Sequence, residues 1–281
     1  MMTKVGPVFL VFFIFVIGVG YLFSYLLGNS QILYFAVIFS VVMSFISYWF
    51  SDKIVLKMAR AQELKEAENP EIYNILKNLC LKANLPLPKV YLLKEQQPNA
   101  FATGRNKNHA AVAVTQGLLD KLNKQELEGV IGHELSHIQN KDMLLQTMVV
   151  VLVGFISIIS RWFLWGQMFG GRKNNQGGAL VILGLIAAIL APLAAMLIQL
   201  AISRKREFLA DKSAAHLTVN PNSLASALEK IAADRNPMKV AQEATAHLYI
   251  SNPLRGQDLT KLFMTHPSTE ERVKALRTMQ F

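Results

Sequence analysis

The chain has 281 residues, of which 52% are hydrophobic and only 17% are charged, whereas globular chains average about 25% charged residues. This composition argues against a disordered chain or an ordinary cytosolic enzyme and favours a protein that lies partly in lipid. The net charge is +10, and in so apolar a chain we attribute it to an anionic membrane rather than to nucleic acid. The single cysteine, Cys80, excludes an internal disulfide and a zinc cluster built from cysteines.

The N-terminal part reads as a pair of membrane helices. No Asp, Glu, Lys or Arg occurs in residues 5–51, a length that fits two spans of about 20 residues each. Turn-forming residues 28–31 interrupt the run, so we predict a transmembrane hairpin of residues 6–27 and 32–50 within a first domain, residues 1–60. A cleaved signal peptide is the alternative, but the apolar run is long and no small-residue cleavage site is evident.

Two more uncharged runs, residues 143–160 and 179–203, predict a second apolar hairpin in residues 143–203. We expect a transmembrane pair, although the first run is slightly short for the hydrocarbon core. Two buried helices of a soluble domain are the alternative. An even number of spans separates the polar parts, residues 61–142 and 204–281, so the two parts share a side and can fold together.

Basic residues near the span ends predict which side that is. The majority of them flank the polar parts, which the positive-inside rule places in the cytoplasm. Arg161, Arg172 and Lys173 in the opposite loop run against the rule but are fewer. The residues that favour this orientation are Lys53, Lys57, Arg60, Lys65, Lys141, Arg204, Lys205 and Arg206.

The polar parts contain clear helix starts and two strand patterns. Helix caps are expected at Asn69, Asn123, Asn220 and Ser268, each followed by a proline or by a glutamate that completes a capping box. Short apolar runs predict strands at residues 89–93 and 110–115. The fold class is therefore α+β and mostly helical: a helical membrane protein whose polar domain carries a small β-sheet.

The chemistry centres on His133, Glu134 and His137, which lie on the helix that begins after Asn123. Residues four apart share one helical face, so the two imidazoles can hold one Zn²⁺ while the glutamate acts as general base. A helix with two surface histidines is the alternative, and the capped start and apolar neighbours argue against it. We therefore predict one Zn²⁺ per chain.

A hydrolytic zinc site needs a third protein ligand and an open position for water. Glu207 and Asp211 are also four residues apart, so Glu207 can bind the metal while Asp211 accepts a hydrogen bond from a ligand histidine. This spacing alone is more typical of a solvated helix surface, so the assignment depends on the zinc motif. Cys80 is a poorer candidate because its position predicts a core face.

The zinc motif, with Glu207-x-x-Ala210-Asp211 after an apolar hairpin, resembles the HtpX family of membrane zinc metallopeptidases, which are relatives of the CaaX prenyl endopeptidases. Three further segments match this family, although Ser268 stands where many relatives have a second proline. The resemblance implies a cytoplasmic peptidase domain of gluzincin type that acts on damaged or misfolded membrane proteins. The matching segments are Asn99–Gly104, Val114–Leu119, and Thr265–Pro267 followed by Arg272.

The resemblance also implies zinc on the three ligands named above, with Glu134 as base. It places Asn99 and Ala100 beside the bound peptide, and His266 and Arg272 near the cleft. Either of these two could stabilise a developing oxyanion. Alternatively, His266 belongs to a turn before a helix, and Arg272 pairs with a nearby carboxylate.

The strand at residues 110–115 is a candidate for binding an extended substrate by β-augmentation, with Val112, Ala113 and Val114 beside the peptide. Such pairing reads the backbone more than the side chains and suits a broad protease. The alternative is an ordinary core strand.

These observations predict a multi-pass zinc endopeptidase with its active site facing the cytoplasm, and the resemblance implies a prokaryotic plasma membrane and a role in stress response and protein quality control. Its partners would be membrane-protein or unfolded polypeptide substrates and the lipid bilayer, with no nucleic acid. Two alternatives stay open: a dedicated processing peptidase of the prenyl-protein type, and a membrane scaffold or transporter with structural zinc. The scarcity of ionisable residues in the spans argues against transport.

Overall fold

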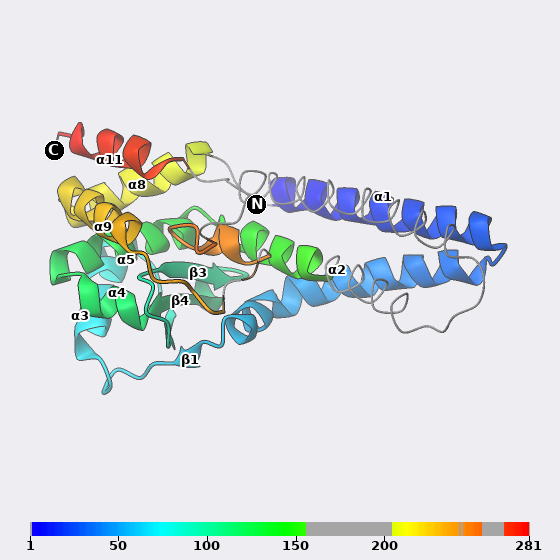
Figure 1. The fold of residues 1–281 in the computed structure, drawn as a ribbon, viewed down its shortest axis with the longest axis horizontal. Helices are drawn as coiled ribbons and strands as arrows, with labels where there is room; N and C mark the ends of the chain where they lie inside the picture. The colour runs from blue at the N-terminus through cyan, green and yellow to red at the C-terminus, as the bar shows by residue number, and fades with distance from the viewer. Residues whose placement is uncertain (1, 156–203, 241, 243, 255–266, 281) are drawn as a thin grey trace.

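The structure is a computed structural model, in which a long pair of helices projects from one end of a domain of helices and strands (Figure 1). Most of the second predicted hairpin, residues 156–203, lies outside the described part of the chain, and so does His266. The described residues are 2–155, 204–240, 242, 244–254 and 267–280.

The helix pair confirms the predicted N-terminal hairpin as two helices, α1 (Met2–Leu27) and α2 (Gln31–Met58). Gly28 turns the chain between them with φ of +63°, a conformation that glycine adopts without strain. Helix α2 is long and apolar enough to cross a membrane, and it continues beyond the predicted end of the apolar run. Gly20 of α1 packs directly against Ala36 of α2, where an added Cβ would overlap the alanine methyl group. Such close contact between small residues is typical of helices that pack in lipid.

The third apolar segment begins a helix at Met143 that is described as far as Phe155. Its side chains from Met143 to Val153 are all buried, and Phe155 packs edge-on against Phe39 of α2. The rest of this segment lies outside the described residues, so the choice between a spanning pair and a buried hairpin stays a prediction.

The small sheet has the strand order β1-β2-β4-β3. Strand β4 pairs in parallel with β2 and antiparallel with β3, so both of its edges are occupied. The prediction that Val112, Ala113 and Val114 receive an extended peptide is therefore wrong, and the alternative of a core strand is correct. The strand bounds are β1 (Gln62–Glu63), β2 (Lys89–Leu93), β3 (Ala100–Gly104) and β4 (Ala110–Thr115).

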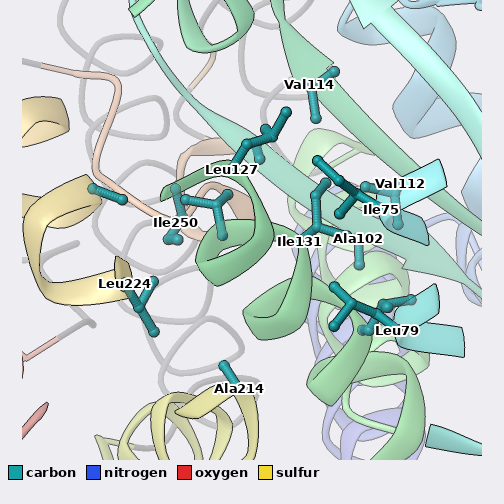
Figure 2. Close-up of a cluster of buried hydrophobic side chains, with 14 of the residues drawn as sticks. Ile75, Leu79, Ala102, Val112, Val114, Leu127, Ile131, Ala214, Leu224 and Ile250 are labelled. Atoms are coloured by element: carbon teal, nitrogen blue, oxygen red, sulfur yellow. The ribbon is translucent and has the colours of Figure 1, made fainter. Parts of the chain in front are cut away.

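Strand β4 is buried on both faces, which explains its unbroken apolar sequence. Val112 and Val114 point into a core shared with the helices of the domain, whereas Ala111 and Ala113 face a second core that includes residues of the helix pair. In the first core, α5 lies centrally between the sheet and the neighbouring helices (Figure 2). The helices that contribute to this core are α3 (Pro70–Ala83), α5 (Lys124–Gln139), α8 (Arg204–Thr218) and α9 (Pro221–Ala233).

All four predicted helix caps are confirmed. Asn69 and Asn220 cap helices that begin with proline, and Asn123 and Ser268 form complete capping boxes, the latter at α11 (Thr269–Arg277). The predicted strands at residues 89–93 and 110–115 are also confirmed. The elements that the sequence did not indicate are short: β1, β3, α4 (Gln116–Lys121), η1 (Lys107–His109) and η2 (Ala246–Leu248).

The close packing of α9 on α5 gives a stability test with an internal control. A Cβ at Gly129 would lie 2.7 Å from the backbone nitrogen of Leu224, whereas a Cβ at Gly132 would lie 3.5 Å from Ala214, an ordinary contact. We expect Gly129→Ala to destabilise the fold by about 1–3 kcal/mol, because α9 must shift. Gly132→Ala should be neutral or stabilising, because alanine favours the helix. Thermal unfolding of both variants checks this, and equal midpoints would contradict the packing argument.

Candidate active site

The catalytic motif lies on α5, a helix whose residues from Glu126 to Ile138 are buried except Glu128. The Asn123 capping box starts the helix, and the apolar side chains of Val130, Ile131 and Leu135 hold it against the sheet and neighbouring helices. This packing places His133, Glu134 and His137 in the interior, with each of the three at most 6% exposed. A fully buried helix therefore fixes the histidines, which excludes the alternative of two surface histidines.

Helix α8 brings Glu207 to the two imidazoles, so the structure assembles the three predicted metal ligands. The two histidine Nε2 atoms lie 3.1 Å apart. Glu207 Oε2 lies 3.7 Å from His133 Nε2, and Glu207 Oε1 lies 3.6 Å from His137 Nε2. Donors at about 2.0–2.2 Å from a tetrahedral zinc ion are separated by about 3.3–3.6 Å. The nitrogen and oxygen donors and their spacing therefore fit zinc.

A carboxylate lies behind each imidazole ring. Asp211 Oδ1 lies 2.9 Å from Nδ1 of His133, a contact that keeps the proton on Nδ1 and leaves Nε2 free to bind a metal. Asp142 Oδ2 lies 3.8 Å from Nδ1 of His137. The sequence analysis missed Asp142. It follows Lys141, whose φ of 60° reverses the chain after α5 and directs Asp142 back toward the helix.

Arg272 lies at the back of the site rather than in an open cleft. It is 2% exposed, and its Nε and Nη2 atoms donate to the two oxygens of Asp211 at 2.9 and 2.6 Å. Its Nη1 donates to the Ile250 carbonyl at 3.0 Å, and Nη2 lies 3.3 Å from Nδ1 of His133. These contacts are those of the structural alternative, an arginine paired with a carboxylate. His266, the other candidate for an oxyanion role, lies outside the described residues.

Burial and charge separate the ionisation of the site residues. Burial lowers the pKa of His133 to about 4, so this ring is neutral, as a metal ligand requires. Burial would also lower the pKa of His137, but the nearby carboxylates, Glu207 foremost, raise it to about 9. The same negative potential that favours the protonated, positively charged imidazole would favour a bound metal cation. Burial raises the pKa of Glu134 to about 7, which makes this carboxylate a stronger base.

The outer edge of β3 lies beside the base. Helix α5 packs on this strand, and the backbone of Ala102 forms a hydrogen bond that contributes to the pKa of Glu134. The start of the edge is covered, because the Ala100 carbonyl accepts from Ile250 N–H at 2.9 Å, and Asn99 Nδ2 donates to the Ser251 carbonyl at 2.8 Å. Asn99 and Ala100 thus anchor a neighbouring segment at one end of this edge. Their expected place beside a peptide stays a prediction.

Comparison with known proteins is consistent with this geometry. The model of Peptidase family M48 matches residues 66–280. A Protease HtpX homolog of Syntrophobacter fumaroxidans is 51% identical over 258 residues, which cover 90% of this chain and 91% of the relative. A Protease HtpX homolog of Thermococcus sibiricus is 49% identical over 268 residues, with 94% and 92% covered.

A crystal structure of Ste24p from S. mikatae is similar in fold, with a TM-score of 0.51 and 18% sequence identity. The match covers 96% of this chain and 62% of that one, so the chain spans less than two thirds of the Ste24p length. The HtpX resemblance and the α+β, mostly helical fold class are confirmed. The zinc cofactor follows from the family together with the three grouped donors. The chain therefore belongs to peptidase family M48 and is a membrane-bound zinc metallopeptidase.

Proposed function

We propose that the chain is an endopeptidase that cleaves damaged or misfolded membrane proteins with Glu134 as its general base. One observation carries the proposal. The buried carboxylate of Glu134 lies between the grouped donors His133, His137 and Glu207 on one side and the outer edge of β3 on the other. A base, a metal site and a strand edge that no other described strand pairs with are the three parts that hydrolysis of an extended peptide needs.

Each residue of the site has a separate role in the proposed hydrolysis. A zinc ion held by His133, His137 and Glu207 would polarise the scissile carbonyl and lower the pKa of a bound water molecule to about 7. Glu134 takes the proton from the attacking water and later delivers it to the leaving amine. His133 and His137 would bind the metal through Nε2; Asp211 holds the His133 ring in orientation, and Asp142 lies 3.8 Å behind the His137 ring. Burial of the base excludes bulk water from the proton transfer.

The substrate lies along β3 in this proposal. The outward carbonyl of Ala102 and the backbone of Gly104 can pair with an extended peptide, because β4 occupies only the inner edge and the Ala102 N–H donates to Glu134. Recognition through the backbone demands flexibility rather than sequence, which suits damaged or misfolded proteins as substrates. Asn99 and Ala100 then mark one end of the peptide site.

The cellular setting that we propose is the plasma membrane of a prokaryote, with a multi-pass chain, a cytoplasmic active site and a role in protein quality control under stress. Residues 1–60 and 143–203 would form the membrane hairpins, and residues 61–142 and 204–281 the peptidase domain. The basic residues after α2 support the orientation.

Replacement of the base gives the direct test. Glu134→Gln keeps the shape of the side chain but cannot accept the proton, so we expect normal zinc content and about 10²–10⁴-fold slower cleavage of an unfolded reporter polypeptide. Purified zinc-loaded protein, metal analysis and the cleavage rate measure both quantities. Glu128→Gln on the same helix is the matched control, because Glu128 lies partly exposed outside the site.

Loss of zinc from Glu134→Gln, or cleavage at the original rate, would remove Glu134 from the role of base. Cleavage of one specific peptide, with the unfolded reporter left intact, would instead favour a dedicated processing peptidase. Full zinc loading without cleavage of any peptide would favour the scaffold with structural zinc.

The contacts of Arg272 allow its role to be separated from oxyanion stabilisation. Arg272→Lys keeps the charge but loses the two-pronged bond to Asp211, so the His133 ring should be less well oriented. We expect zinc affinity to fall about 10–100-fold, the range typical when a group that orients a ligand is changed. Competition with a chelator measures this. The control is Arg277→Lys on the same helix as Arg272, which alters an exposed pair with Glu229 of α9. Unchanged zinc affinity with a slower rate would favour the oxyanion role.

The orientation is tested with single cysteines read by a membrane-impermeant reagent in intact cells. Labels at Asn106 and Gln257 should react only after the membrane is opened, because both belong to the proposed cytoplasmic domain. A label at Asn175 should react from outside if both segments of the second hairpin span. Protection of Asn175 in folded protein would favour the buried-hairpin alternative, and outside labelling of Asn106 would reverse the proposed orientation.

A further inference from the structure

The end of α2 carries a basic stripe next to an aromatic side chain. Trp49, Lys53 and Lys57 follow one another at spacings of four residues, so they lie on one face of the helix. Arg60 follows just after the helix ends at Met58, with φ of 51°. Trp49 is 44% exposed, and the three basic side chains are exposed. The apolar part of α2 ends at Phe50, so this face lies where the helix leaves the hydrocarbon layer.

Arg105 joins this stripe from the turn after β3. Its guanidinium lies 4.6 Å from the centre of the Trp49 ring, a distance typical of a cation–π contact. Arg105 Nη2 lies 2.9 Å from His109 Nε2, and His109 Nδ1 lies 2.9 Å from the side-chain oxygen of Asn106. Since that oxygen can only accept, Nδ1 donates to it and Nε2 accepts from Arg105. The guanidinium is therefore held in one place on the tryptophan.

The charge of the stripe is not neutralised by a direct ion pair within the described residues. In the described part of the chain, Lys53, Lys57 and Arg60 form no ion pair with a carboxylate. Lys53 lies 5.8 Å from the centre of the exposed Phe50 ring. Of the neighbouring carboxylates, Glu63 pairs with Lys89. These three exposed cations are therefore available to an anionic partner at the membrane boundary.

We propose that the basic stripe, Lys53, Lys57 and Arg60, together with Arg105 on Trp49, binds anionic phospholipid headgroups of the adjacent leaflet. Tryptophan prefers the membrane interface. Lys53 and Lys57 follow Trp49 by about 6 and 12 Å along the helix axis, and their flexible side chains can reach back toward the phosphate layer. Juxtamembrane clusters of basic residues bind anionic lipid in this way.

Lipid binding at this place has a consequence for the active site. Arg105 immediately follows Gly104, the last residue of β3. A headgroup that binds Arg105 therefore fixes the height of the β3 edge above the bilayer. The lipid site itself depends only on α2 crossing the membrane and not on the proposed substrate, so a binding measurement tests it separately from the peptidase activity.

The test measures how strongly brominated lipids quench the fluorescence of Trp49. Trp162→Phe and Trp165→Phe leave Trp49 as the single tryptophan, and the full chain is reconstituted in phosphatidylcholine vesicles that contain phosphatidylglycerol. The bromine is carried by phosphatidylglycerol in one sample and by phosphatidylcholine in the other, and the quenching in the two samples is compared. A single basic residue near an anionic surface contributes roughly fivefold in binding, so we expect at least a fivefold preference for phosphatidylglycerol.

Substitution of the stripe should weaken this preference. The triple variant Lys53→Gln, Lys57→Gln, Arg60→Gln should lower the ratio of quenching by brominated phosphatidylglycerol to quenching by brominated phosphatidylcholine severalfold, because only Arg105 of the proposed site keeps its charge. A control that removes the same charge from the far side of the domain should leave it unchanged, namely Lys82→Gln, Lys124→Gln, Lys274→Gln. Should the stripe variant fail to insert, about 1 M salt, where charges are screened beyond about 3 Å, should lower the ratio of the unaltered chain. A ratio near one before substitution, an unchanged ratio in the stripe variant, or an equal loss in the control would overturn the proposal.

Discussion

The pairing of Arg272 with Asp211 is the interaction on which the site geometry depends. Arg272 comes from the last helix, Asp211 from α8 and His133 from α5, yet the three side chains contact one another in the interior. Burial opposes ionisation of Asp211, but the guanidinium lowers its pKa to about 2, so it stays charged beside the ring. A buried pair that lost one partner would leave an uncompensated charge, a large cost. The C-terminal helix is therefore part of the metal site and not an appendage.

The sheet connects this site to the membrane. One face of β4 packs on the helices that carry the zinc ligands, and its other face packs in the core that contains residues of α1 and α2. The outer edge of β3 lies beside Glu134, and the turn after β3 lies on Trp49. A strand of five residues thus spans the distance between the base and the membrane boundary. If the proposed lipid and substrate sites hold, this arrangement gives a physical reason for a peptidase to be built on a membrane helix pair, because the lipid surface then sets the position of the β3 edge.

Local signals were sufficient for much of this structure. The caps at Asn69, Asn123, Asn220 and Ser268 each predicted a helix start, because cap residues act within one turn. The spacing of His133 and His137 predicted their common face. Sheet order was different: an apolar hexapeptide reads the same in a central strand and in an edge strand, so β4 was mistaken for the substrate edge and β3 was not recognised as a strand. Asp142 was missed because its position near His137 depends on the left-handed turn at Lys141. A lysine in the sequence does not predict a left-handed conformation.

The central claim is that three buried side chains, two imidazoles and one carboxylate, hold a catalytic zinc ion. X-ray absorption at the zinc edge of the purified full-length protein tests it most directly. The account predicts only nitrogen and oxygen donors at about 2.0–2.2 Å, with two imidazoles, and loss of the bound zinc in Glu207→Ala. A sulfur donor at about 2.3 Å, or a zinc environment unchanged in Glu207→Ala, would contradict it.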